Sequence, residues 1–339
     1  MTLALIISVA AAFLVALFFI RPVMRFLGKI GVLGIDQQKA GKPRIPTSGG
    51  IAAITGILAG VFFFIGLETF FIRSNVNVLV LVAAAFSVFI ITMVGFFDDL
   101  VVDSISRKDK GVEEYRIGLR QWQKPLLVLP AAIPLMAISA GTSVMYLPFL
   151  KEINLGILYP LLLVPIGVLC VTNATNMLAG MNGLEAGLGF VATSSLGAYA
   201  LYLGRIEASV IAFTGAAALL VFLIWNWHPA KILPGDSLTY LTGAVIISAV
   251  VVGNMEKFGV MVFILWIIEA VLKLTSKFKA RSLGELQPDG TLKAPYKGVF
   301  SLTHIVMKVR PFTEKQVSLI LILTQAIISL AAFWVVVNF

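Results

Sequence analysis

Residues 77–99 read NVLVLVAAAFSVFIITMVGFFDD, and this stretch decides the fold class. It holds about twenty uncharged and mostly apolar residues, enough for an α-helix to cross a bilayer core of about 30 Å. The run ends in two adjacent carboxylates, Asp98 and Asp99. An acid that is removed from water at the end of a span needs a cation or a metal as its partner. If both acids are solvated instead, they only mark the start of a loop. The stretch predicts a transmembrane helix with a candidate site at its mouth, and the solvated pair is the alternative.

The composition places the whole chain in the membrane class. Its 339 residues are 59% hydrophobic and 13% charged, with a mean hydropathy of +0.98. These values lie far from those of soluble domains. The single cysteine, Cys170, lies in an apolar segment, so we expect a packing role and no disulfide. The first apolar run, residues 1–20, has no basic stretch before it, which favours a retained span over a signal peptide.

Hydropathy predicts an all-α polytopic protein with about ten transmembrane helices. The chain is treated as one integral membrane domain, residues 1–339, with no separate soluble domain. The expected spans are 2–20, 49–71, 77–97, 125–141, 155–172, 187–203, 208–225, 237–253, 258–274 and 317–337.

Basic residues alternate between the connections and predict the orientation. Of the 26 Lys and Arg residues, 22 lie in every second connection or at its edge. The other four are Arg73, Lys151, Arg205 and Lys257. Positive loops mark the cytoplasmic side, so we expect both termini outside and the active site at the cytosolic face. This asymmetry explains the net charge of +9 without a nucleic-acid partner. The expected cytosolic loops are 21–48, 98–124, 173–186, 226–236 and 275–316.

The first two cytosolic loops combine cations with other polar groups. Residues 39–51 read KAGKPRIPTSGGI, in which Lys42 and its neighbours are placed to hold phosphate and the glycine pair allows close backbone approach. A positive loop that ends in a turn is the simpler alternative. After Asp98 and Asp99, a basic stretch leads to Lys124 at the next span, and carboxylates beside cations suit a metal and anionic oxygens. Attraction to lipid headgroups is the alternative for the middle of this stretch.

The third and fourth cytosolic loops add amide groups and a third acid. Asn176 can give a neutral oxygen to a metal, and Asn182 can both donate to and accept from a heterocycle edge. Helix capping and small-residue packing are the alternatives. Asp236 follows the turn Pro234-Gly235 at the start of a span. Three carboxylates and an Asn at one membrane level suit Mg²⁺, which prefers oxygen ligands and is often shared with substrate phosphates.

The last cytosolic loop contains Lys279 and Arg281, which suit a phosphate clamp. The segment GELQPDGTLKA, residues 284–294, predicts a small hairpin. Glu269 lies inside the ninth predicted span without a visible partner, so no role is assigned to it. His228 is expected at the membrane interface, since no second His has metal-site spacing to it.

Taken in order, these motifs resemble the polyprenyl-phosphate N-acetylhexosamine-1-phosphate transferases over nearly the full chain. The resemblance is carried by PTSGG, GFFDD, NATNMLAGMNGLEAG, PGDS and KAR, each at the mouth of a predicted span. NGLEAG and the closing SLTHIVMKV are similar to the archaeal and eukaryotic enzymes that transfer GlcNAc-1-phosphate to dolichyl phosphate. The phospho-MurNAc-pentapeptide branch carries a His-rich motif in the last cytosolic loop, where this chain has only His304.

The resemblance implies the reaction and a role for each matched residue. A UDP-GlcNAc donor would pass GlcNAc-1-phosphate to a polyprenyl or dolichyl-type phosphate with Mg²⁺, or Mn²⁺ in its place, and release UMP. The protein would lie in the membrane of a prokaryotic cell, in contact with membrane lipid. A homodimer is compatible with the sequence. The implied metal ligands are Asn176 and Asp236. The implied catalytic residues are Asp98, Asp99 and Lys124. The implied substrate-binding residues are Lys42, Thr47, Gly180, Asn182, Glu185, Lys279 and Arg281.

Two departures and two alternatives accompany this expectation. The position where the family often stacks an aromatic residue on uracil is Leu233, and Asp103 lies one place beyond the common DDxxD spacing. Another UDP-HexNAc donor would suit the same residues. An ion-coupled transporter is the rival from a different class, although its acids are expected near the bilayer midplane and these gather at one face.

Overall fold

A computed structural model describes residues 2–100, 107–109, 112–114, 123–138, 144–145 and 153–338. Asp103 and most of the predicted basic stretch before Lys124 lie outside the described residues. The expected hairpin at 284–294 is confirmed: β7 (Glu285–Leu286) and β8 (Thr291–Lys293) pair antiparallel, and the Asp289 carboxylate accepts the backbone N–H of Thr291 at 3.0 Å.

Helices dominate the described chain. The longer ones are α1 (Thr2–Lys29), α2 (Gly50–Leu67), α3 (Val78–Leu100), α6 (Val164–Thr175), α7 (Leu184–Tyr202), α8 (Ile206–Asn226), α9 (Gly235–Gly253), α11 (Ile264–Thr275) and α13 (Glu314–Asn338). The short helices are η1 (Glu68–Ile72), α4 (Gln123–Val128), η2 (Leu129–Ala132), α5 (Ile133–Ala137), η3 (Tyr159–Leu163), α10 (Glu256–Val262) and α12 (Leu302–Val309).

Short antiparallel strands join some of these helices. They are β1 (Leu33–Ile35), β2 (Arg44–Pro46), β3 (Arg107–Asp109), β4 (Val112–Glu114), β5 (Val144–Met145), β6 (Ile153–Asn154), β7 (Glu285–Leu286), β8 (Thr291–Lys293) and β9 (Phe312–Thr313). The largest sheet has three strands, in the order β7-β8-β9. In the described part of the chain, these small sheets lie in the connections between helices.

Six described helices are long and apolar enough to cross a membrane, and a seventh span results if the pair α10 and α11, bent by 60°, counts as one. Two predicted spans, 125–141 and 155–172, correspond to short apolar helices at 126–137 and 159–175. Both are shorter than the six long helices, and each contains proline at the first positions of a helical segment, where its missing N–H breaks no hydrogen bond of that segment. The predicted span 187–203 corresponds to α7. The chain is therefore a polytopic helical membrane protein.

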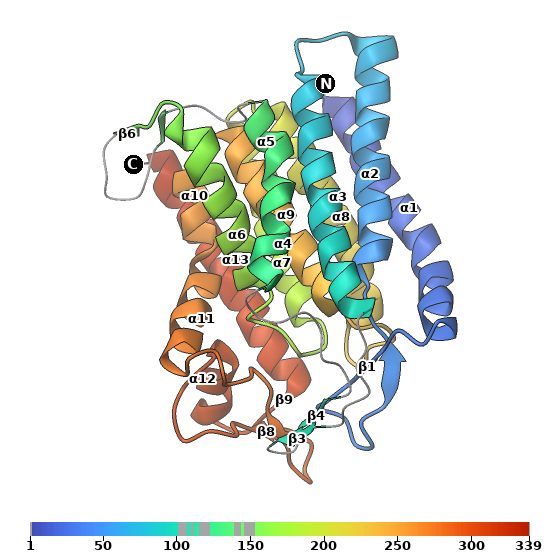
Figure 1. Cartoon of the computed structure of the whole chain (residues 1–339), viewed down its shortest axis with the longest axis vertical. Coiled ribbons are helices and arrows are strands. Elements are labelled where there is room, and N and C mark those ends of the chain that lie inside the picture. The colour runs from blue at the N-terminus through green and yellow to red at the C-terminus, as the bar shows by residue number, and fades with distance from the viewer. Residues whose placement is uncertain are drawn as a thin grey trace.

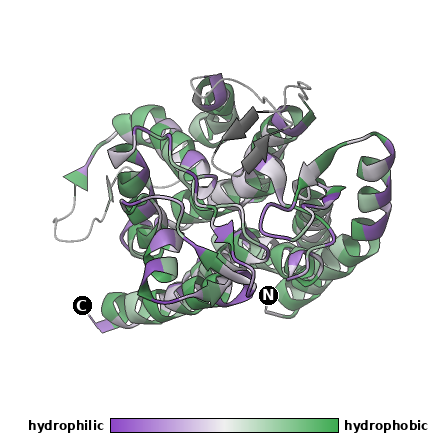
Figure 2. Ribbon diagram, turned by 90° about the horizontal axis from the view of Figure 1, so that it is seen from below, coloured by the Kyte–Doolittle hydropathy of each residue, from purple (hydrophilic) through white to green (hydrophobic). Residues whose placement is uncertain are grey.

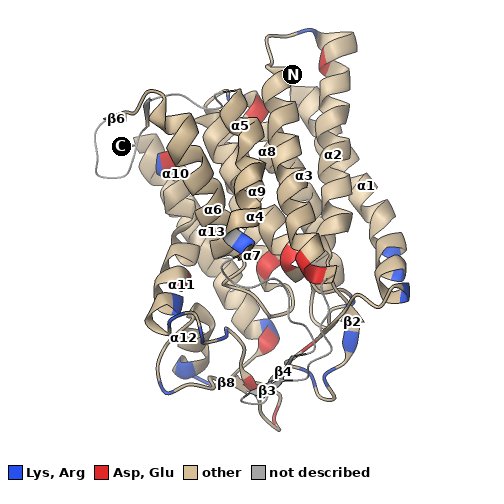
Figure 3. Cartoon of the chain, viewed as in Figure 1, with Lys and Arg blue, Asp and Glu red and all other residues tan. Residues whose placement is uncertain are grey.

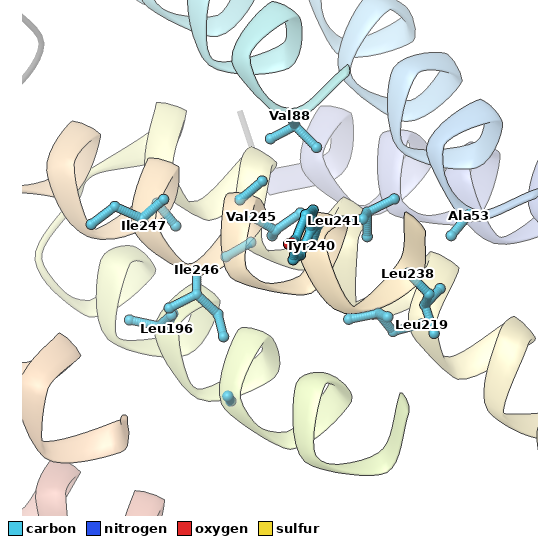
Figure 4. Close-up of a cluster of buried hydrophobic side chains, with 14 of the residues drawn as sticks. Ala53, Val88, Leu196, Leu219, Leu238, Tyr240, Leu241, Val245, Ile246 and Ile247 are labelled. Atoms are coloured by element: carbon cyan, nitrogen blue, oxygen red, sulfur yellow. The ribbon is translucent and has the colours of Figure 1, made fainter. Parts of the chain in front are cut away.

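The core is built around α9. The most apolar window of α9 is 83% buried, against 22% for α13, so α9 lies inside the bundle and α13 at its edge. Figure 4 shows side chains of α9 facing Val88 of α3, Leu196 of α7 and Leu219 of α8. Figure 2, seen from below, shows the helices mostly in the hydrophobic colour, and many of their large apolar residues are exposed, as expected for contact with lipid.

The two ends of the bundle differ in character. In Figure 1 the two termini lie toward the upper end, and the loops with β1, β8 and α12 lie at the lower end. This placement agrees with an even number of crossings. Figure 3 shows most Lys and Arg residues around the lower loops, where several acids also gather at the helix ends. The charge asymmetry read from the sequence therefore corresponds to one end of the molecule.

Glycines bring α2 and α3 against the start of α9. A Cβ added to Gly95 would lie 2.7 Å from Cα of Ser237, and one added to Gly50 would lie 2.7 Å from the backbone nitrogen of Leu238. We expect Gly95→Ala to push α3 away from α9 and lower the free energy of unfolding by about 1–3 kcal/mol. Thermal unfolding in detergent measures this. Gly66→Ala is the control, since its added Cβ meets nothing within 4 Å; equal melting temperatures for both variants would contradict the close packing.

Candidate active site

Two carboxylates from distant parts of the chain meet one lysine at the lower end of the bundle. Lys124 of α4 donates to Asp98 Oδ2 at 2.6 Å and to Asp236 Oδ2 at 2.5 Å. Asp98 ends α3 and Asp236 begins α9, and their carboxyl groups interact directly. Two acids this close repel each other unless a cation lies between them. The expected convergence of the DD pair, the PGDS motif and Lys124 is observed.

Asp99 makes different contacts from its neighbour. Its Oδ1 accepts the backbone N–H of Asp236 at 3.0 Å, and its Oδ2 accepts that of Ser237 at 3.2 Å. These are N–H groups of the first turn of α9, which have no partner within that helix. A carboxylate there also interacts favourably with the helix dipole. The observed geometry makes Asp99 the group that fixes the start of α9 and therefore the position of Asp236.

Ser48 and Ser237 belong to this centre although the sequence interpretation did not single them out. Ser48 Oγ donates to Ser237 Oγ at 3.0 Å, and the side chain of Ser48 also bonds to Asp99. Ser237 Oγ in turn accepts the backbone N–H of Gly50 at 3.1 Å. The signal was present in the sequence as a hydroxyl residue directly before a glycine pair. In the PTSGG motif, Ser48 reaches the acids, whereas Thr47 is buried against Gly34.

Asn176 comes to the same place from the end of α6. It is the C-terminal cap residue of this helix and lies beside Asp236, and its Oδ1 accepts the Thr239 hydroxyl at 3.0 Å. Asp98 and Asp236 therefore offer carboxylate oxygens at one point, and the Asn176 amide group lies beside Asp236. Among the described residues, no group of three or more His, Cys, Asp or Glu side chains could hold a metal. The oxygen set fits Mg²⁺ that takes its other ligands from water and substrate phosphate.

A cavity of about 1260 Å³ opens beside these residues. Its polar end is lined by Lys124, Asn176, Gly180 and Arg281. The remaining wall comes mainly from apolar residues of α6, α9, α10 and α11. Some of those residues, such as Ile166 and Val271, are also exposed on the outer face of the bundle. Cys170, expected to be packed, is exposed and lines this cavity instead.

The segments that contain Gly180 and Arg281 touch where they line the cavity. Gly180 has a φ of +109°, and a Cβ added there would lie 2.7 Å from Cδ2 of Leu283. Glycine therefore allows the two loops to touch. The Gly180 N–H donates to Glu185 Oε1 at 2.6 Å, and Glu185 is buried in the first turn of α7. This contact gives Glu185 a role in shaping the loop, and it is not among the residues that line the cavity.

Asn182 lies in a buried polar cluster that the sequence did not reveal. Its Nδ2 donates to Asp36 at 3.1 Å, its Oδ1 accepts from Lys39 at 3.0 Å, and its backbone N–H donates to Glu314 at 2.7 Å. Lys39 also pairs with Glu314, and His228 Nε2 lies 3.7 Å from that carboxylate. Burial raises the pKa of Asp36, and Lys39 opposes this shift. The cluster holds Asn182 through two other segments: Asp36 and Lys39 bind its side-chain amide, and Glu314 of α13 binds its backbone N–H.

The structure does not place two of the predicted basic substrate contacts at the cavity. Lys42 lies in the turn between β1 and β2, and Lys279 is exposed after α11. Neither is among the residues that line the cavity. Both remain predictions about substrate binding.

Comparison with known proteins fits this geometry. A model of the family described as Glycosyl transferase family 4 matches residues 78–254, which include Asp98, Asn176 and Asp236. A protein of Saccharolobus solfataricus, provisionally named UDP-N-acetylglucosamine–dolichyl-phosphate N-acetylglucosaminephosphotransferase, is 34% identical over 97% of this chain and 96% of its own length. The chain belongs to glycosyl transferase family 4. The resemblance drawn from its motifs is thereby confirmed.

Other members of glycosyl transferase family 4 are also similar to this chain. A Dictyostelium discoideum protein with the same name, given without qualification, is 25% identical over 88% of this chain and 80% of its own length. A phospho-N-acetylmuramoyl-pentapeptide-transferase of Shouchella clausii is 31% identical over 80% of this chain and 83% of its own length. These relatives are named as transferases of phosphorylated amino sugars, and the transporter alternative receives no support.

Proposed function

We propose that this protein transfers GlcNAc-1-phosphate from UDP-GlcNAc to a polyprenyl phosphate of the dolichyl type and releases UMP. One observation carries the proposal: Lys124 and Asn176 line a large apolar cavity, and they contact the acids, Lys124 both Asp98 and Asp236, and Asn176 Asp236. A charged reaction centre joined to an apolar groove suits a substrate with a phosphate head and an isoprenoid tail. The provisional name of the Saccharolobus relative supports the same donor and acceptor.

The cavity offers the acceptor a route from the bilayer. Exposed residues along its wall, including Ile166 and Val271, let a lipid enter sideways while its phosphate reaches Lys124. The tail would lie along α6 and α9, and its burial against apolar residues stabilises binding by about 25 cal/mol per Å². The donor would approach from the opposite side of the cluster, through the loops with Gly180 and Arg281.

The chemistry is a direct displacement. An oxygen of the lipid phosphate attacks the β-phosphorus of the donor, a new P–O bond forms, and the bond to the α-phosphate oxygen breaks with release of UMP. Lys124 and Arg281 offset the repulsion between the two anions. Mg²⁺ or Mn²⁺, when bound by Asp236 and Asn176, would neutralise charge on the diphosphate. Asp98 shares Lys124 with Asp236 and so keeps the ammonium group directed toward the acceptor phosphate.

The membrane arrangement that we propose has ten crossings with both termini outside. In addition to the six long helices, the pair α10 and α11, helix α7 and the two short apolar segments would provide the others. The positive loops then face the cytosol of a prokaryotic cell, where UDP-sugars are made. A homodimer is compatible with this arrangement.

The decisive test is a transfer assay. We expect purified protein with Mg²⁺, a polyprenyl phosphate and radiolabelled UDP-GlcNAc to form a lipid-linked sugar and stoichiometric UMP. UDP-GalNAc and UDP-MurNAc-pentapeptide belong in the panel because a phospho-N-acetylmuramoyl-pentapeptide-transferase is similar to this chain. Turnover of a different donor would show that the transferred sugar is not GlcNAc. If folded protein turns over no donor, the proposal is refuted.

The cavity predicts a selective effect on the acceptor. A Cβ added to Gly167 of α6 would lie 3.0 Å from Cδ1 of Ile247, so Gly167→Leu fills the apolar part of the groove. We expect the KM for a long-chain acceptor to rise about tenfold, because lost apolar burial of about 1.4 kcal/mol corresponds to that factor. Donor KM should stay within twofold. Gly66→Leu, at an open helix position, is the control, and equal acceptor KM values in both variants would exclude this groove.

A further inference from the structure

Glu269 is a buried acid that the proposed chemistry does not use. It lies in α11 with 0% of its surface exposed, and the sequence showed no partner for it. A buried carboxylate needs hydrogen-bond donors or a cation, because its desolvation is otherwise too costly. Its partners therefore indicate what the residue does.

The carboxylate of Glu269 joins three parts of the chain. Oε1 accepts the Ser282 hydroxyl at 3.1 Å and lies 3.4 Å from Lys273 Nζ. Oε2 accepts the Ser301 hydroxyl at 3.1 Å and the backbone N–H of Leu302 at 2.7 Å. Both oxygens are thereby occupied. The Glu269 side chain therefore anchors two segments to α11: the loop that follows α11 and the start of α12.

The loop anchored in this way carries Arg281. Lys273, held by Glu269, donates to the Ala280 carbonyl at 3.0 Å, so the residues on both sides of Arg281 are attached to the same ion pair. The Thr303 hydroxyl also donates to the Ser282 carbonyl at 2.6 Å. The backbone on both sides of Arg281 is thus held, and Arg281 is one of the residues that line the cavity.

The same anchor reaches the opposite wall of the cavity. Ser282 Oγ lies 3.0 Å from the Met177 carbonyl, directly after Asn176. His304 is buried behind the loop, next to the backbone of Arg281 and Leu283, and burial lowers its pKa to about 4, so it stays neutral near Lys273. The segment 280–283 is thus attached on three sides. A loop held only by solvent contacts would not show this pattern.

We propose that Glu269 is a positioning residue that sets the affinity for the donor diphosphate by holding Arg281 at the polar end of the cavity. This inference rests on the proposed function for the identity of the ligand. Stability alone does not explain the residue, since buried ion pairs can often be replaced by apolar side chains without loss of stability. The Glu269 charge instead holds the segment 280–283, with Arg281 inside it, in one defined position.

The first test does not depend on activity. Glu269→Gln should increase amide hydrogen exchange of residues 280–283 and 301–303 by at least about tenfold, since loss of the charged acceptor weakens every anchor bond. Glu269→Gln alone leaves the Lys273 charge buried without its carboxylate. The double variant Glu269→Gln with Lys273→Met has no unpaired buried charge, so we expect it to fold even if the single variant does not. Thr275→Ala, whose hydroxyl bonds only within α11, is the control. Unchanged exchange in these segments would overturn the proposal.

The second test asks whether Glu269 acts through Arg281. We expect Glu269→Gln to raise the donor KM about tenfold and leave the acceptor KM within twofold. Arg281→Ala should raise the donor KM at least as much. The double variant should show little further increase, because Arg281→Ala removes the same guanidinium group that Glu269→Gln displaces. Fully additive effects, or an equal rise in both KM values, would overturn the proposal.

The two tests separate this inference from the proposed function. If the wild-type protein turns over no UDP-sugar, the proposed function fails. Hydrogen exchange of Glu269→Gln still decides whether the residue holds the Arg281 loop. Binding of UMP or UDP to the wild-type and variant proteins, measured by calorimetry, then replaces the donor KM.

Discussion

Asp236→Ala should lower the rate of sugar-phosphate transfer at least about a hundredfold while the protein still folds. Loss of a metal ligand or of a preorganised charge has effects of this size. Asp236 lies 2.5 Å from Lys124 and beside Asn176, at the place where the donor diphosphate and Mg²⁺ would meet. Folding is expected to survive because Lys124 keeps Asp98 as a partner.

The milder variant Asp236→Asn separates metal binding from other roles. It keeps one oxygen and the side-chain shape but removes the charge, so the Mg²⁺ concentration for half-maximal rate should rise about tenfold or more. Rates measured over a Mg²⁺ titration, with thermal unfolding of each variant, check this. Asp289→Asn, on the exposed hairpin, is the matched control. If Asp236→Asn has the wild-type Mg²⁺ dependence, Asp236 does not contribute to metal binding.

The convergence of the acids was predictable because span parity determines which loops share a membrane face. Asp98 and Asn176 lie at the C-terminal ends of α3 and α6, Asp236 lies at the N-terminal start of α9, and the structure brings the three together. Sequence periodicity could not show which acid does what. Asp98 faces Lys124, but Asp99 turns to the backbone of α9, and that difference depends on how α3 packs against α9.

The buried anchors could not be predicted for a related reason. Glu269 bonds to residues up to 33 positions away, and Glu314 bonds to Asn182 across 132 positions. A hydropathy profile treats each acid as a local interruption and contains no information about such partners. The glycines at Gly50 and Gly95 are similar: each is an apolar helix residue in the sequence, and only the contact with α9 explains it.

Helix length and one bend separate the described chain from the predicted spans. The predicted spans 125–141 and 155–172 correspond to apolar helices at 126–137 and 159–175, which are shorter than the six long helices. The bend of 60° between α10 and α11 has no proline at Phe263 and was not predicted.

Lys124→Met should reduce turnover by about a hundredfold or more and also destabilise the protein. The change leaves Asp98 and Asp236 side by side without the ammonium group that now contacts both. Removing one partner of a buried charge pair costs about 3–5 kcal/mol, so a lower melting temperature is expected without Mg²⁺. A divalent cation would take over part of the neutralisation, and Mg²⁺ should therefore restore more stability to this variant than it adds to the wild type.

Lys124→Arg distinguishes charge from geometry. Arginine keeps the positive charge but presents a planar fork in place of a compact ammonium group. We expect near-wild-type stability with turnover reduced about tenfold, because the two carboxylates can still be neutralised while the cation no longer reaches the acceptor phosphate in the same place. Lys293→Met, on exposed β8, is the control. Full activity of Lys124→Met would show that this lysine neither orders the acids nor contacts the reacting phosphates, and the proposed centre would then have to exclude it.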